Sequence, residues 1–145
     1  MKALLTAIKT QLQADLTYIR DSDIYITEDE RLIPDAVKFP AVGLKDGRVE
    51  YEVLGRAEDL EATLYVVIIA YVRLHKAESA IMGDTATGKK GVLDIIADIK
   101  TALRFNLFSG DVQEADPISE TESELLADET TAIQMKSLTM RYRRY

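Results

Sequence analysis

The loop GDTATGKK, residues 83–90, carries the residue types closest to chemistry in this chain. In the phosphate-binding pattern Gly-x-x-x-x-Gly-Lys-Ser/Thr, backbone amides wrap the phosphates, the lysine reaches the terminal ones, and the hydroxyl binds magnesium. Gly83, Gly88 and Lys89 match this pattern, but Lys90 stands where the hydroxyl is required, and an ammonium cannot ligate a cation. A connector leading into a helix is therefore the favoured interpretation, and a small nucleotide- or ligand-binding domain using Gly83–Lys90 is an alternative.

The two lysines of this loop have a third interpretation. Lys89 and Lys90 offer a basic spot for a partner's carboxylates, which the acidic segment 109–129 would supply across an interface. This hypothesis predicts that Lys89→Glu with Lys90→Glu weakens assembly without unfolding the subunit.

Composition argues against most other chemistry. The chain has no cysteine and one histidine, His75, so thiolate nucleophiles, sulfur-ligated zinc and histidine-rich metal sites are excluded. We expect no catalytic residue, no metal and no cofactor, and hence not an enzyme. A net charge of −7 argues against a protein that grips phosphate backbones, and it suits a surface that DNA passes without sticking. The longest apolar run is interrupted by Glu61, Thr63 and Arg73, so no membrane span is expected.

Hydrophobic periodicity predicts two helices. The first covers residues 4–19, where apolar residues recur at helical spacing, and the second runs from Val92 to Leu107. Between the helices lie a short strand at 24–27, a charged loop excursion at 28–39, and two strand-like runs at 41–45 and 48–54. Asp46-Gly47 predicts a hairpin turn between those runs, because both positions tolerate positive φ. Alternation of Val49, Tyr51 and Val53 with glutamates predicts one buried face.

A long apolar strand is expected at 60–74, and a closing strand at 130–145. A bulge is expected near Lys136-Ser137, because the apolar residues of the closing strand switch there from odd to even positions. Residues 109–129 are acidic, so we expect an acidic loop with at most one short element. A chain of 145 residues with 47% hydrophobic residues suits one domain, 1–145. The predicted fold class is α+β: an antiparallel, at most mixed, sheet with two helices packed on one face.

The long strand is apolar on both faces. Tyr65, Val67, Ile69 and Tyr71 form the middle of the second face, which is either covered by the chain's own loops or meets another subunit. Fifteen strand residues span about 50 Å, so the strand is expected to bend, bulge or project, and a projecting end favours a homo-oligomer. The basic cluster Arg141, Arg143 and Arg144 is expected to pair with carboxylates between subunits.

Taken in order, the elements resemble the tail terminator, or tail-completion, proteins of long-tailed bacteriophages and prophages. The resemblance rests on the N-terminal helix, FPAVGL at 39–44, the strand ending AYVRL at 70–74, the helix GVLDIIADIKTAL at 91–103, the acidic stretch, and SLTMRY at 137–142.

The resemblance implies a virion protein of the tail or neck, made in the host cytoplasm, whose copies form a ring, typically a hexamer. Such a ring caps the tail tube, ends its polymerisation and offers a head-joining surface. The implied partners are the chain itself, the tail tube protein and a head-completion or connector protein, with DNA passing through the lumen without specific binding. Another neck or tail subunit, such as a head–tail connector or minor tail protein, is the alternative within this class.

Overall fold

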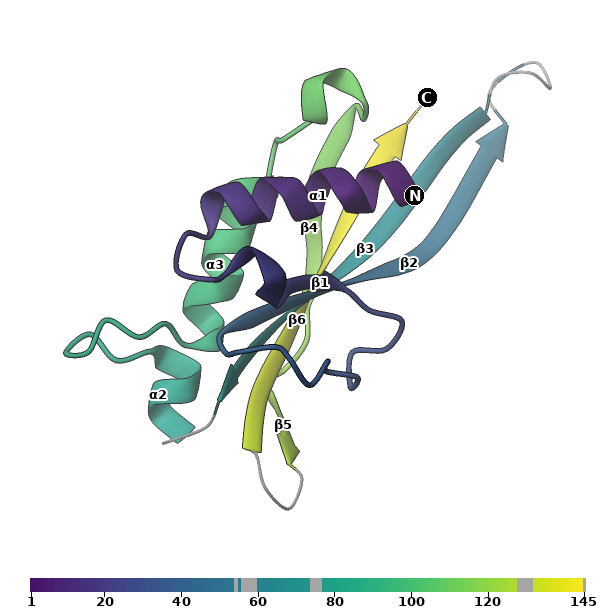
Figure 1. The fold of residues 1–145 in the computed structure, drawn as a ribbon. Coiled ribbons are helices and arrows are strands. Elements are labelled where there is room, and N and C mark those ends of the chain that lie inside the picture. Colours follow the sequence, from purple (N-terminus) through teal and green to yellow (C-terminus); the bar gives the residue numbers. More distant parts are fainter. Residues whose placement is uncertain (54, 56–59, 74–76, 128–131, 145) are drawn as a thin grey trace.

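The computed structural model describes residues 1–53, 55, 60–73, 77–127 and 132–144. Within these ranges, six strands form one sheet that is accompanied by three α-helices (Figure 1). In chain order the elements are α1 (Lys2–Asp15), β1 (Ile24–Ile26), β2 (Ala41–Val53), β3 (Leu60–Arg73), α2 (Ala77–Met82), α3 (Val92–Leu103), β4 (Glu114–Glu120), β5 (Glu124–Ala127) and β6 (Ala132–Arg144).

The sheet is mixed, with a single parallel pair among the described strands. Its order is β1-β2-β3-β6-β4, and β5 pairs with β6 beyond the end of β4. β1 runs parallel to β2, whereas β2–β3, β3–β6, β4–β6 and β5–β6 are antiparallel. Helices α1 and α3 lie on one face of the sheet (Figure 1). The predicted α+β class is therefore confirmed.

The helices follow the predicted apolar stripes but end earlier than expected. In α1, Leu4, Leu5, Ile8 and Leu12 are buried at helical spacing, and burial of each such side chain contributes about 1.5–3 kcal/mol. The helix ends at Asp15, and Leu16 and Ile19 are buried in the turn that follows. α3 ends at Leu103 rather than Leu107, because Phe105 adopts a positive φ of 63° that an α-helix cannot contain.

The predicted hairpin at Asp46-Gly47 is wrong. β2 continues through both residues, and its register against β3 shifts between Asp46 and Val49, which marks a β-bulge. A Cβ on Gly47 would lie 2.6 Å from the Tyr65 carbonyl oxygen, so glycine is needed there for close approach of two backbones. The antiparallel partner of β2 is β3, paired from Ala41↔Tyr71 to Val53↔Leu60.

The predicted bulge at Lys136-Ser137 is also wrong. β6 pairs with β3 without a register shift, from Ala62↔Arg144 to Arg73↔Ile133. The apolar residues switch from odd to even positions along β6 because each face of the strand is covered over a different half of its length. Leu138, Met140 and Tyr142 pack under the helices, whereas Ile133 and Met135 pack on the opposite face.

The acidic segment 109–129 contains two strands, where a loop with at most one short element was expected. Several of its carboxylates, those of β4 and β5, are balanced by cations on neighbouring elements, which the sequence of the segment alone does not reveal. Glu114 lies 3.4 Å from Arg143, Asp116 lies 3.5 Å from Arg141, and Glu120 lies 3.0 Å from Lys100. The excursion 28–39 is irregular, as expected, and its Ile33, Val37 and Phe39 pack on the sheet face opposite the helices.

Candidate assembly surface

The glycine loop is closed on itself. The amide of Asp84 donates to the Lys89 carbonyl at 2.9 Å, and the amide of Lys89 donates to the Asp84 carbonyl at 3.1 Å. The Ala86 amide donates to the Asp84 carboxylate at 3.0 Å. Three amides that a phosphate cradle would aim at its ligand are thus occupied within the loop, and the Asp84 carboxylate would repel a phosphate.

The two lysines of the loop have different surroundings. The Lys90 ammonium lies 3.4 Å from the Asp98 carboxylate and 5.3 Å from the centre of the Tyr18 ring. Lys89 is exposed. At the start of α3, the Asp94 carboxylate accepts a hydrogen bond from the Gly91 amide at 3.0 Å. This carboxylate occupies the helix N-terminus that a bound anion would use.

Part of the second face of β3 is buried by the chain itself. Ile69 and Tyr71 have no exposed surface, and they pack with Ala41 and the excursion 28–39. The Tyr71 hydroxyl donates to the Glu30 carbonyl, and the Tyr71 ring stacks on Tyr25 with centroids 6.3 Å apart. Of the two explanations offered for this face, coverage by the chain's own loop describes Ile69 and Tyr71.

The other half of this face combines apolar and charged side chains, and its Val67 packs against the same apolar cluster as Ile69 and Tyr71. Tyr65 is 9% exposed, and the Arg48 guanidinium lies 4.1 Å from the centre of its ring. Val67 and Arg144 are half-buried. Arg141 pairs with Asp116, and Arg143 lies between Glu61 at 3.5 Å and Glu114 at 3.4 Å. The structure thus pairs Arg141 and Arg143 with carboxylates of the same chain, where pairing between subunits was expected. His75 lies outside the described residues.

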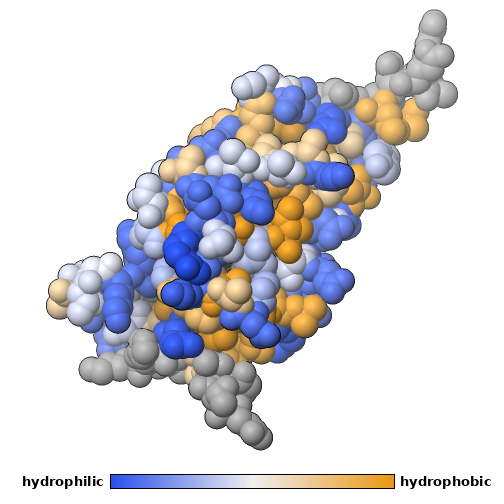
Figure 2. Space-filling view, in the orientation of Figure 1, coloured by the Kyte–Doolittle hydropathy of each residue, from blue (hydrophilic) through white to orange (hydrophobic). Residues whose placement is uncertain are grey.

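The joined ends of β2 and β3, residues 51–53 and 60–62, form a projecting arm. Among the described residues, the pairing of β6 with β3 runs up to Ala62, and Figure 1 shows β2 and β3 projecting together at this corner of the sheet. Tyr51 is 66%, Val53 59% and Leu60 50% exposed. Figure 2 shows hydrophobic surface where the arm leaves the body. The predicted burial of Tyr51 and Val53 is wrong, because their strand pair extends beyond the helices that cover the sheet.

A hollow of about 260 Å³ lies at the opposite end of β3. Four cations and two aromatic rings surround it and the adjoining hollow of about 450 Å³. The Arg73 guanidinium, which lines both, lies 5.9 Å from the centre of the Phe39 ring. We call this pair the basic hollow; its lining consists of Tyr18, Val37, Lys38, Phe39, Pro40, Val72, Arg73, Gly88, Lys89 and Lys90. The sequence identified Lys89 and Lys90 here but missed Lys38 and Arg73, which are distant along the chain.

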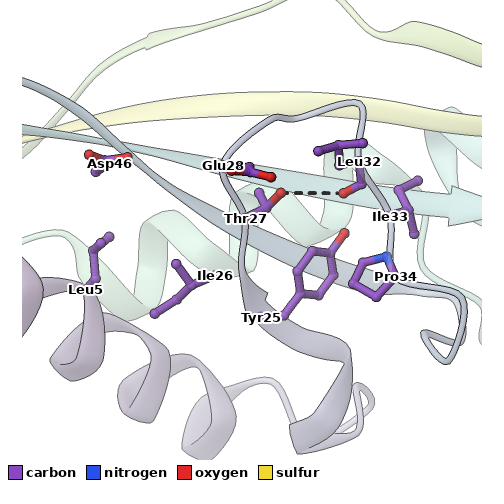
Figure 3. Close-up of a pocket in the computed structure, with 9 residues that line it drawn as sticks. All are labelled: Leu5, Tyr25, Ile26, Thr27, Glu28, Leu32, Ile33, Pro34 and Asp46. Atoms are coloured by element: carbon purple, nitrogen blue, oxygen red, sulfur yellow. Dashed lines mark hydrogen bonds between the residues drawn. The ribbon is translucent and has the colours of Figure 1, made fainter.

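A second hollow, of about 660 Å³, opens at the outer side of β2 (Figure 3). The chain from Thr27 to Pro34 forms one wall, held by the Thr27 hydroxyl, which donates to the Asp29 carbonyl at 2.8 Å. Glu28 and Asp46 lie at this hollow among apolar side chains, which are Leu5, Tyr25, Ile26, Leu32, Ile33 and Pro34. We call it the acidic-rimmed hollow.

The described residues include no group of three histidine, cysteine or carboxylate side chains placed to hold a metal ion. Across the same part of the chain, no helix is long and apolar enough to cross a membrane. Exposed apolar side chains gather on the arm, and charged and aromatic side chains gather around the hollows. Surfaces of this kind are suited to binding a macromolecular partner.

Comparison with known proteins finds a likeness of fold. Neither a protein-family model nor a curated protein matches the chain. Among solved structures, this chain is similar to a chain from the virion of a native gene transfer agent (GTA) particle, with a TM-score of 0.57 and 16% sequence identity. The match covers 97% of this chain and 92% of the other. This similarity shows that the two chains share a fold along nearly their whole length.

Proposed function

We propose that this chain is a structural subunit of a phage-like particle whose copies form a ring on the end of the tail tube. The ring, a hexamer in this proposal, ends tube polymerisation and presents the surface to which the head joins. One observation carries the proposal: the fold similarity to a chain of a gene transfer agent virion, which covers 97% of this chain. The likeness supports a place in a phage-like particle, and the tail-terminator role is taken from the resemblance of the sequence.

The surfaces of the chain support a role in assembly. The arm exposes Tyr51, Val53 and Leu60 together. Tyrosine is among the residue types that contribute most of the binding energy in protein interfaces, and the apolar neighbours add surface to be buried. The glycine loop, in contrast, uses its amides for its own hydrogen bonds. This arrangement favours binding between proteins over binding of a nucleotide.

Charge supports the proposed position around the DNA path. A net charge of −7 per copy gives a ring that DNA passes without specific binding, since phosphate affinity comes from clustered cations. The partners in this proposal are further copies, the tail tube protein, and a head-completion or connector protein. The proposed location is the tail or neck of the virion.

The test is a capping experiment with polymerising tail tubes. The purified chain is added to growing tube protein from the same particle, and electron microscopy measures tube lengths and the occupancy of tube ends. We expect closed rings at one end of the tube and an arrest of growth at those ends. Unchanged growth with bare ends would contradict the proposal. Rings that bind head-side proteins but leave tube length unchanged would indicate the alternative, another neck subunit.

A further inference from the structure

We propose that the arm of one copy enters the basic hollow of the next copy, so that subunits join head to tail. This proposal rests on the ring-forming function proposed above and identifies the contact that builds the ring. The partner is a second copy of this chain, identified by the complementary chemistry of two surfaces that each copy carries.

The arm combines exposed apolar side chains with negative charge. Tyr51, Val53 and Leu60 are at least half exposed. The pairing Val53↔Leu60 and Tyr51↔Ala62 places these apolar side chains on one face of the strand pair. Within the described part of the arm, Glu52 is exposed and Glu61 pairs with Arg143 at 3.5 Å. In the sequence, the connection between the two strands, residues 54–59, adds Glu58, Asp59 and Arg56. Such a surface requires a partner with apolar walls and cationic groups.

The basic hollow has these properties. Phe39, Pro40 and Val72 give it apolar walls, while Lys38, Arg73, Lys89 and Lys90 place four cations around it. No carboxylate is among the described residues that line it. In a chain with a net charge of −7, this cluster is the complement of the acidic arm.

Two other pairings fit less well. The acidic-rimmed hollow presents Glu28 and Asp46, which would repel the carboxylates of the arm. In the acidic segment 109–129, Glu114, Asp116 and Glu120 pair with cations of the same chain. Glu50 and Glu61 at the arm are paired too, with Arg48 and Arg143, but the arm also keeps Glu52 exposed next to Tyr51, Val53 and Leu60. The arm and the basic hollow are therefore the best-matched pair of surfaces.

Strand β3 determines the geometry of this contact. Leu60 lies in the arm and Arg73 lines the basic hollow, so one strand carries the two surfaces about 43 Å apart, at about 3.3 Å per residue. Two different surfaces at opposite ends of a subunit make a heterologous contact. Repeated with a constant rotation that closes, such a contact gives a ring.

Two variants, each with one damaged surface, test this contact. The arm variant is Tyr51→Ser with Val53→Ser, both at exposed positions. The hollow variant is Lys38→Glu with Lys89→Glu, which leaves the Lys90–Asp98 ion pair in place. Sedimentation velocity of each variant alone should show a monomer, with self-association weakened at least about tenfold. A control with the same change in net charge, Lys2→Glu with Arg104→Glu, should assemble like the original chain.

Mixing the two variants gives the sharpest result. The intact arm of the hollow variant can enter the intact hollow of the arm variant, while the two damaged surfaces cannot pair. We therefore expect the mixture to form a dimer of one copy of each variant and nothing larger. A mixture that stays monomeric, or variants that assemble like the original chain, would overturn the proposal.

The two proposals fail in different ways. If the original chain caps tail tubes as closed rings while both variants still assemble, the ring function stands and the arm contact is wrong. If the two variants form the expected dimer but the original chain leaves tubes uncapped, the contact stands and the tail-capping function is wrong.

Discussion

Tyr71 and Tyr142 are both buried, but within the described part of the chain only the hydroxyl of Tyr71 makes a hydrogen bond, so the two residues are expected to respond differently to loss of the hydroxyl. Burial raises the pKa of both Tyr71 and Tyr142 above the ordinary value, so both hydroxyls stay protonated at neutral pH. The Tyr71 hydroxyl donates to the Glu30 carbonyl, whereas the Tyr142 hydroxyl has no hydrogen-bond partner among the described residues. We expect Tyr71→Phe to lower the free energy of unfolding by about 0.5–1.5 kcal/mol, and Tyr142→Phe to leave it unchanged or raise it. Urea unfolding of both variants checks this pair, and equal losses would contradict it.

Asp23 gives a prediction that depends on pH. Its buried carboxylate accepts hydrogen bonds from Arg20 at 2.8 and 3.0 Å and from the Lys38 amide at 3.0 Å. The Arg20 hydrogen bonds, chiefly, hold the pKa of Asp23 below its ordinary value of 3.8. Since the folded-state pKa is lowered, the stabilisation is present above the unfolded-state pKa and is lost as pH falls through the folded-state value.

Asp23→Asn should therefore lower the free energy of unfolding at pH 7 by about 1–3 kcal/mol. The difference from the original chain should shrink below the ordinary pKa of 3.8, as Asp23 of the original chain becomes protonated. Urea unfolding at a series of pH values measures this difference. Asp21→Asn, at an exposed neighbour, is the control and should show little effect. A difference that stays constant down to acid pH would show that the charge of Asp23 is not the cause.

At the scale of elements, the bulge in β2 depends on Gly47. A Cβ at this position would lie 2.6 Å from the Tyr65 carbonyl oxygen, which is backbone and cannot move aside. Gly47→Ala should therefore cost about 1–3 kcal/mol and disturb the pairing of the arm strands. Gly43→Ala in the same strand is the matched comparison, since its Cβ would meet the Tyr71 ring edge at 3.2 Å, which requires a smaller displacement than the 2.6 Å contact with backbone at Gly47. Thermal unfolding of both should show the larger loss for Gly47→Ala.

The same bulge illustrates what the sequence could predict. Periodicity located β3, the apolar stripe of α3 and the short β1, because those patterns depend on neighbours along the chain. Asp46-Gly47 was mistaken for a turn, since a glycine required for close backbone approach has the same sequence signal as one required for positive φ. β4 and β5 were missed because their carboxylates are balanced by Arg141, Arg143 and other cations that come close only after folding.

The candidate surface was predictable only in part, for a related reason. Lys89 and Lys90 are adjacent in sequence, whereas the basic hollow also needs Lys38 and Arg73, which tertiary structure brings beside them. The length of β3 predicted that the strand would bend, bulge or project. The alternation of Val49, Tyr51 and Val53 predicted burial, which holds only where helices cover the sheet.

At the scale of the whole molecule, assembly must overcome a repulsion between copies that each carry a charge of −7. At about 0.1 M salt the screening length is about 10 Å, so distant charges already contribute little to this repulsion. In the proposed contact, charges of the arm and the basic hollow would be screened much less at that ionic strength. Local attraction can therefore decide whether acidic copies associate.

Raising salt from about 0.1 M to about 1 M shortens the screening length to about 3 Å and should weaken this contact attraction. We expect the proposed rings to dissociate toward monomers over this range, while the urea midpoint of the subunit changes little because its core is apolar. Light scattering of the original chain, read beside unfolding curves at the same salt concentrations, measures both effects. Rings that persist or grow with salt would mean that burial of Tyr51, Val53 and Leu60 outweighs the charges, since apolar association does not weaken with screening.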